Sequence, residues 1–306
     1  MVSQKPRAIC ILGMHRSGTS LLTRAVNLLG PYVGTPNLLM PPHETNPTGF
    51  WEHLEIVQIH KQIMKKLKSS WDTTRPLPPR WWITKEMLPY KARLKNIIVR
   101  DFAGKTLWMW KDPRTCLLLP LWKSILKELG IDLHCVLVVR NPIDVASSLL
   151  KRDHISVKKS LHMWALHTLN SLQYSQGTRR VLIHYDRFLA NGHGTLYHIA
   201  KKLDLPWPAS DLHLKQTMGR LIQPDLRHSF SSVDDLIKKG NVAPLLLTLY
   251  RMCLIINRFP ERMNSPWMAK NVKRLCDAYY GGKPLIKGYP SPVRRRIKRK
   301  RIKRRK

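Results

Sequence analysis

The segment from Ala8 to Leu29 restricts the fold more than any other part of the chain. Apolar residues up to Leu12 lead into a loop bounded by glycines, and apolar residues then recur at helical spacing. This order predicts a strand, a loop and a helix. Gly13 and Gly18 allow the backbone to curl around an anion, and the first amides of the helix point into the same loop. The segment therefore predicts an anion-binding loop at the edge of an α/β sheet.

The place of the positive charge distinguishes this loop from the one that binds nucleoside triphosphates. Both have the spacing Gly-x4-Gly, but the triphosphate loop continues with Lys and then Ser or Thr. Here Gly18 is followed by Thr19 and Ser20, and the cation is Arg16, whose planar fork can hold a phosphate-like group. The alternative interpretation is a tight turn before a buried helix. The predicted anion contacts of the loop are Gly13, His15, Arg16, Ser17, Gly18, Thr19 and Ser20.

The chain is basic well beyond its C-terminal end. Its 306 residues contain 54 Lys and Arg against 19 Asp and Glu, a formal net charge of +35. Eleven of the 13 residues from Arg294 to Lys306 are basic, and without them 43 basic against 19 acidic residues still give +24. The length suits one large α/β domain or two small ones. We predict one domain at 1–289, and the basic, low-complexity composition from Pro290 onward predicts a disordered polybasic tail at 290–306. An anionic cofactor, an anionic polymer and a membrane surface all fit this charge.

The cysteines favour a reducing compartment. The chain has five, an odd number without a Cys-x-x-Cys pair, which indicates reduced and buried thiols and a cytoplasmic setting. Neither a signal peptide nor a membrane span is predicted, because the longest apolar stretch, Val242 to Ile256, is short and contains Arg251. Peripheral contact at the inner face of a membrane stays open.

A second anion site is predicted after a later strand. Residues His134 to Val139 form an apolar strand, Arg140 stands at its end, and Asn141-Pro142 opens a helix. Ser148 lies two helical turns further on, on the face that it shares with Asp144 and Arg152. Arg140 and Ser148 are therefore expected to share one anion. Two such sites at one sheet edge suit a ligand that is phosphorylated at both ends.

Another strand, Thr106 to Trp110, runs directly into Lys111-Asp-Pro-Arg114. Open α/β sheets bind ligands at the carboxyl ends of their strands. Lys111 and Arg114 are therefore candidates for contact with the same ligand, and Asp112 for organising the loop. A solvated turn is the alternative.

Glu52 is the candidate general base. It follows a loop rich in Pro and Asn, and the helical pattern from Trp51 to Leu67 places it in the first turn of a helix. An acidic residue at that position also stabilises the helix dipole, so both interpretations stay open. Glu44 in the same loop is the second choice for the base, and His53 and His60 are less favoured.

The two anion motifs together resemble those of a known enzyme family. His-Arg-Ser-Gly-Thr-Ser after the first strand resembles the 5′-phosphosulfate loop of sulfotransferases that use 3′-phosphoadenosine-5′-phosphosulfate (PAPS). Arg140-Asn-Pro-Ile-Asp-Val-Ala-Ser-Ser148 resembles their 3′-phosphate motif. The resemblance covers most of the chain, and its order and spacing are similar to bacterial-type sulfotransferases. The cytosolic enzymes for phenols and steroids carry Lys where this chain has Arg16, whereas the tyrosyl-protein and several carbohydrate enzymes share the Arg.

The resemblance implies a P-loop-like three-layer α/β fold, with a central parallel sheet of about five strands flanked by helices. It implies transfer of a sulfuryl group from PAPS to a hydroxyl, or less favourably an amine, of a carbohydrate or glycolipid. Glu52 would remove the acceptor proton, and Arg16 and Lys111 would stabilise the departing phosphate. Tyr185 would lie near the adenine, and Arg227 would contact the nucleotide. No metal is expected, because Arg and Lys supply the positive charge.

Two other classes of protein stay open. A P-loop kinase or GTPase fits the glycine spacing but needs the missing Lys and a carboxylate for magnesium. A nucleic-acid-binding protein fits the charge, although no nucleic-acid module is recognisable and no specific nucleic-acid partner is expected. For the basic tail, the alternatives are a solubilising segment and attachment to an anionic membrane or polymer.

Overall fold

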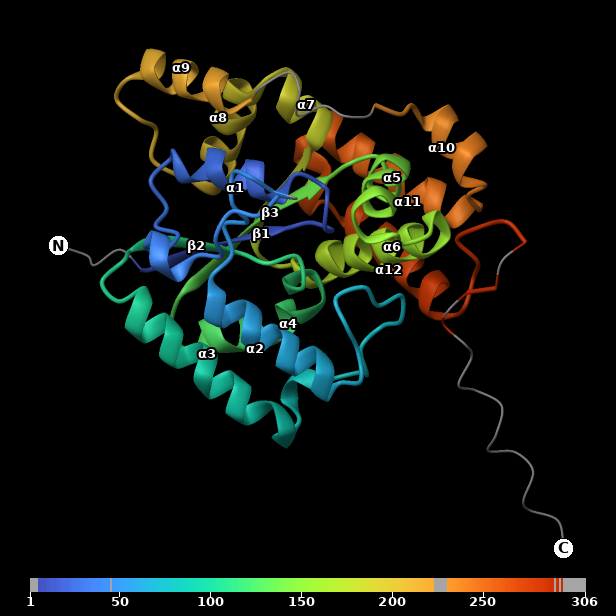
Figure 1. The fold of residues 1–306 in the computed structure, drawn as a ribbon, viewed down its shortest axis with the longest axis horizontal. Helices are drawn as coiled ribbons and strands as arrows, with labels where there is room; N and C mark the ends of the chain where they lie inside the picture. The colour runs from blue at the N-terminus through green and yellow to red at the C-terminus, as the bar shows by residue number, and fades with distance from the viewer. Residues whose placement is uncertain (1–4, 45, 223–229, 289, 292, 294–306) are drawn as a thin grey trace, which may run out of the picture.

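Within the residues that the structure describes (5–44, 46–222, 230–288, 290–291 and 293), four parallel strands form one sheet through the middle of the computed structural model (Figure 1). The strands are β1 (Arg7–Leu12), β2 (Leu107–Lys111), β3 (Asp132–Val139) and β4 (Arg179–His184), in the order β2-β1-β3-β4. Every neighbouring pair is parallel, so all four carboxyl ends lie at one edge. The loops that follow the strands therefore meet at that edge.

Alternate side chains of each strand enter two different cores. In β1, Ile9 and Ile11 pack on one face, whereas Ala8, Cys10 and Leu12 pack on the other. Both faces are buried, which explains why the strands read as continuous apolar runs instead of alternating ones. All five cysteines are free and buried, as the sequence predicts.

Helices cover both faces and complete three layers (Figure 1). One face is covered by α1 (Thr19–Asn27), α7 (Tyr185–Ala190), α8 (Gly192–Leu203) and α9 (Asp211–Leu221). The other carries α2 (Leu54–Lys66), α3 (Leu88–Asp101), α4 (Thr115–Glu128), α5 (Pro142–Asp153), α6 (Val157–Tyr174), α10 (Val233–Gly240), α11 (Pro244–Arg258) and α12 (Pro266–Tyr280). Short 3-10 turns stand at η1 (Pro36–Leu38), η2 (Trp81–Ile83), η3 (Lys85–Met87) and η5 (Pro260–Asn264).

The predicted fold class is confirmed: helices flank a central parallel sheet, with four strands in the described residues where about five were expected. Within the same residues, no helix is both long enough and apolar enough to cross a bilayer. The tail beyond residue 293 and Arg227 lie outside the described residues.

The prediction that Glu52 stands in the first turn of a helix is wrong. Helix α2 begins at Leu54, and His53 before it is extended and bridges Leu39. Trp51 has a left-handed φ of 59°, and the Glu52 carbonyl accepts a hydrogen bond from the Met40 amide at 2.8 Å. A contact with a distant part of the chain therefore holds Glu52 outside the helix.

Candidate active site

The loop after β1 has the backbone of an anion cradle. Arg16 and Gly18 both take left-handed conformations, with φ of 67° and 86°, and α1 starts at Thr19. Alternation of left- and right-handed residues turns successive amides toward one concave side, where the helix also directs its positive end. The loop lies on the sheet edge because Gly13 packs against Val138 of β3, where an added Cβ would lie 2.7 Å from the valine side chain.

The second predicted anion motif lies against this loop. The Arg16 Nε donates a hydrogen bond to the Ser148 Oγ at 2.8 Å, which joins the loop to α5 across 132 residues. The Arg140 guanidinium lies 4.9 Å above the Tyr185 ring. That ring in turn packs against Gly18. The ends of β1, β3 and β4 therefore bring five predicted site residues to one place.

Positive charge is concentrated there. Burial lowers the pKa of Arg16, and the nearby charges of Arg152 and Arg140 lower it further. For the Tyr185 hydroxyl, which is neutral when protonated, burial raises the pKa, and the positive charge of Arg140 opposes that shift. Because like charges repel, guanidinium groups whose charges act on one another favour a bound anion that offsets the repulsion.

A buried ion pair adjoins the cradle. The Lys111 Nζ donates to the Glu52 Oε1 at 2.7 Å and to the Ser20 Oγ at 3.2 Å. Glu52 is 6% exposed and Lys111 is 2% exposed. Ser20 also donates to the Phe50 carbonyl at 3.1 Å, so the segment before Glu52 lies directly on the start of α1. The lysine predicted from β2 therefore links the carboxylate to the anion loop.

Burial raises the pKa of Glu52, and Lys111 and Arg114 offset only part of that effect. The Arg114 Nη1 lies 3.8 Å from the second oxygen, Oε2, and 2.7 Å from the Asp112 Oδ1. Within the described residues no hydrogen bond reaches the Glu52 Oε2. A carboxylate with one occupied and one open oxygen, and with a raised pKa, is suited to accept a proton.

The other candidates for the base do not contact the anion loop or Lys111 in the described residues. Glu44 is exposed. His53 pairs with Asp101 at 3.0 Å, on the side of α2 that faces α3. His60 is fully buried, with Asp112 and Trp122 on its two ring nitrogens.

His15 and Ser17 stand in the loop without partners at the atoms that matter for binding. The His15 Nε2 and the Ser17 Oγ are buried and have no hydrogen-bond partner in the described part of the chain. Burial holds the pKa of His15 well below its usual range, so the ring is neutral, and it packs edge-on against Trp71 at 4.9 Å. Neither atom therefore has its hydrogen-bonding capacity used within the described residues.

The sequence did not reveal several contacts of this region. His60 of α2 contacts Asp112, and Trp122 of α4 donates to His60; no local motif marks either contact. Asp144 accepts hydrogen bonds from the Ser231 amide at 3.2 Å and hydroxyl at 2.6 Å, which ties α5 to the segment before α10. In the described residues, no group of three or more His, Cys, Asp or Glu side chains is placed to hold a metal ion.

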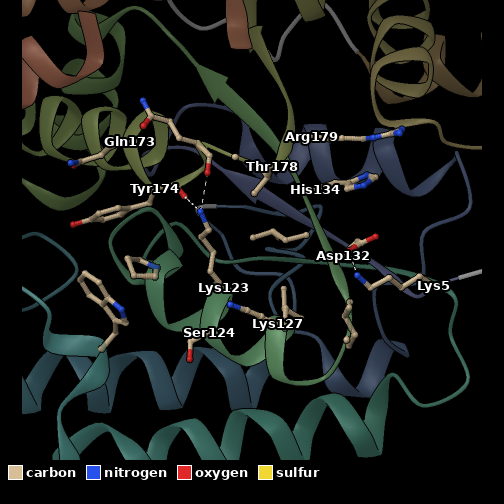
Figure 2. Close-up of a pocket in the computed structure, with 18 residues that line it drawn as sticks. Lys5, Lys123, Ser124, Lys127, Asp132, His134, Gln173, Tyr174, Thr178 and Arg179 are labelled. Atoms are coloured by element: carbon tan, nitrogen blue, oxygen red, sulfur yellow. Dashed lines mark hydrogen bonds and ion pairs between the residues drawn. The ribbon is translucent and has the colours of Figure 1, made fainter. Parts of the chain in front are cut away.

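An open pocket of about 870 Å³ lies at the opposite edge of the sheet, beside the starts of β3 and β4 (Figure 2). Its Lys123 donates to the Tyr174 and Gln176 carbonyls at 3.0 and 2.9 Å, and its Lys5 pairs with Asp132 at 2.6 Å. None of the predicted site residues lines it. Because the predicted anion contacts and the candidate base all lie at the loop after β1, we place the chemistry there.

Gly18 offers a test of how closely the loop and Tyr185 are packed. An alanine Cβ there would lie 2.2 Å from the Tyr185 ring, whereas one at Gly104, also left-handed, would meet nothing within 4 Å. Gly104→Ala is expected to lose about 1 to 2 kcal/mol of unfolding free energy from backbone strain alone. Gly18→Ala is expected to lose about 1 to 3 kcal/mol more from the clash. Urea unfolding measures both, and equal losses would contradict the packing.

Among the comparisons with known proteins, only the one with solved structures finds matches. No protein-family model matches the chain, and no curated protein matches it. A sulfotransferase domain from the Curacin biosynthetic pathway is 15% identical, with a TM-score of 0.41, over 90% of this chain and 98% of its own. A sulfotransferase domain from the Synechococcus PCC 7002 olefin synthase is 18% identical, with a TM-score of 0.42, over 84% and 96%. Retinol dehydratase in complex with androsterone and inactive cofactor PAP is 13% identical, with a TM-score of 0.39, over 89% and 80%.

Proposed function

We propose that this protein is a sulfotransferase that moves a sulfuryl group from PAPS to a hydroxyl, or less favourably an amine, of an acceptor. The observation that carries the proposal is the contact between Arg16 and Ser148, which joins two anion-binding motifs at one sheet edge. A nucleotide with a phosphate on its 3′ oxygen and a phosphosulfate on its 5′ oxygen has the matching pair of anionic groups.

The proposed binding mode assigns one group to each motif. The loop amides, with Arg16, hold the 5′-phosphosulfate at the positive end of α1. Arg140 and Ser148 hold the 3′-phosphate, and the Tyr185 ring, buried beneath Arg140, lies near the adenine. A guanidinium and a hydroxyl supply charge-assisted hydrogen bonds to a phosphate.

In the proposed reaction the Glu52 Oε2 takes the proton from the acceptor hydroxyl. The acceptor oxygen then forms a bond to sulfur while the bond between sulfur and the phosphate oxygen breaks. The electron pair of that bond leaves with 3′-phosphoadenosine-5′-phosphate (PAP). Arg16 and Lys111 stabilise the charge that grows on the leaving phosphate, and positioning with electrostatics supplies most of the acceleration.

Binding and transfer are tested separately. Calorimetry with PAP, AMP and ATP is expected to show much tighter binding of PAP, and equal affinities would contradict the cofactor assignment. Labelled-sulfate PAPS is then offered with neutral sugars, glycolipids, phenols and amines, since we propose a carbohydrate or glycolipid acceptor. Label on another class would change the acceptor and leave the reaction in place, whereas magnesium-dependent ATP hydrolysis with no PAPS binding would favour a kinase or GTPase.

We further propose that the basic tail attracts the protein to an anionic surface, which fits a cytoplasmic enzyme at the inner face of a membrane. Each Lys or Arg near such a surface contributes about 1 kcal/mol, within a Debye length of about 8 Å at physiological salt. Deletion of Arg294 to Lys306 removes 11 positive charges. The truncated protein is expected to keep its melting temperature and PAPS affinity but to leave anionic vesicles at lower salt in co-sedimentation. Identical binding curves would assign the attraction to the basic body instead.

A further inference from the structure

A buried hydrogen-bond chain runs from Trp122 of α4 through His60 and Asp112 to Arg114, beside the candidate base. Trp122 Nε1 donates to the His60 Nε2 at 2.8 Å, and the His60 Nδ1 contacts the Asp112 Oδ2 at 2.7 Å. An indole N–H can only donate, so the His60 Nε2 is an acceptor and the ring proton is on Nδ1. Trp122 is held in place by stacking on Trp110 of β2, with ring centroids 4.4 Å apart. His60 is therefore neutral and has one fixed tautomer.

His60 fixes Asp112, and Asp112 fixes Arg114. The Asp112 Oδ1 accepts from the Arg114 amide at 2.9 Å and from its Nη1 at 2.7 Å, while Oδ2 accepts from His60. Burial alone would raise the pKa of Asp112, but Arg114 and His60 outweigh it and hold that pKa well below its usual range. A carboxylate with no exposed surface and with donors on both oxygens cannot rotate without losing them.

The position of Arg114 affects the carboxylate of Glu52. The same Arg114 Nη1 is 3.8 Å from the Glu52 Oε2, beyond hydrogen-bond distance, whereas it lies 2.7 Å from the Asp112 Oδ1. If Arg114 closed on Oε2, both oxygens of Glu52 would be occupied, since Lys111 already holds Oε1. The guanidinium would also lower the pKa of the carboxyl group and make it a weaker base.

We infer that Asp112, oriented by His60 and Trp122, is a positioning residue that holds Arg114 back from Glu52 and so keeps the Glu52 Oε2 open for the acceptor proton. This inference rests on the proposed function for its catalytic meaning. The charged groups that act on Glu52 are Lys111, Asp112 and Arg114, all from the end of β2 and the loop after it.

Asp112→Asn is the first test. The amide attracts Arg114 less, so the arginine is expected to move onto Glu52. The turnover number is expected to fall about tenfold or more. The acidic limb of its pH profile is expected to move down by roughly one pH unit, because loss of the Asp112 charge and a closer Arg114 both lower the pKa of the base. The affinity for PAP is expected to stay unchanged, since the contact between Arg16 and Ser148 is untouched.

His60 supplies matched variants. His60→Leu removes the donor to Asp112 and is expected to change turnover and the pH limb in the same direction, whereas His60→Asn keeps an N–H near the place of Nδ1 and is expected to restore most of the activity. His134→Leu is the control: it removes a histidine of similar burial, 5% exposed, at the opposite edge of the sheet. A loss in His60→Leu with the pH limb unmoved would show a structural role only and overturn the proposal.

A crystal structure of Asp112→Asn decides the matter without an activity assay. Arg114 within hydrogen-bond distance of the Glu52 Oε2 is the expected result. An Arg114 that stays at its present distance overturns the inference, whether or not sulfuryl transfer is detected. Failure of the wild-type protein to bind PAP would instead refute the proposed function. The position of Arg114 in the variant would still show whether Asp112 holds it away from Glu52.

Discussion

Glu52→Gln is expected to lose about a hundredfold or more in turnover, the size typical of removing a general base. The glutamine keeps the size of the side chain and an oxygen for Lys111, which now donates to Glu52 at 2.7 Å. What it loses is the ability to accept a proton. The affinity for PAP is expected to change little, because the nucleotide contacts proposed here come from other residues. Single-turnover transfer of labelled sulfate and calorimetry measure the two quantities.

Glu44→Gln is the matched control for this prediction. Glu44 belongs to the same loop region but is exposed, so the Glu44→Gln variant is expected to keep the turnover of the wild-type protein. Full activity in Glu52→Gln together with a large loss in Glu44→Gln would move the base to Glu44. Full activity in both variants would remove carboxylate base catalysis from the mechanism.

The pH dependence of the wild-type protein follows from the burial of the base. Because burial raises the pKa of Glu52, the carboxyl group takes up its proton at a higher pH than an exposed glutamate does. The protonated form cannot accept the acceptor proton, so kcat/KM is expected to fall as the pH drops through this raised value. The acidic limb is therefore expected above the usual glutamate range, and it should disappear in Glu52→Gln.

Arg140→Gln is expected to weaken PAP binding by about 1.5 to 3 kcal/mol, roughly ten- to a hundredfold, through loss of a charge-assisted contact with the 3′-phosphate. AMP lacks that phosphate, so its affinity is expected to change much less. A larger loss of affinity for PAP than for AMP would show loss of a specific contact with the 3′-phosphate, whereas equal losses would show an effect of general positive charge. Calorimetry on the variant and the wild-type protein with both ligands measures it.

Arg179→Gln controls for net charge. Arg179 is exposed and lines the pocket at the opposite edge of the sheet, so its loss removes the same unit charge at a distance from the proposed site. PAP binding is expected to be unaffected. Equal weakening by the two variants would show that the overall charge of the protein, and not a 3′-phosphate site, attracts the nucleotide.

Local sequence signals determined the elements that carry the candidate site. The glycine-bounded loop, the apolar strands and the helix start at Asn141-Pro142 each depend on residues a few positions apart, and all appear where they were predicted. Because carboxyl ends of parallel strands share an edge, the sequence also predicted that Arg16, Lys111 and Arg140 lie at the same edge of the sheet. Arg227 and the tail lie outside the described residues and stay predictions.

The contacts between these elements came only from the tertiary structure. Periodicity placed Glu52 in a helix, but its backbone pairs with Met40 and it stands before α2. Nothing in the sequence showed that Arg16 would contact Ser148, that His60 would contact Asp112, or that Trp122 would donate to His60. The physical reason is the range of the interactions. Backbone preferences act over a few residues. A buried charge, in contrast, needs hydrogen bonds in the interior, and the packing of distant helices decides which partners lie close enough to supply them.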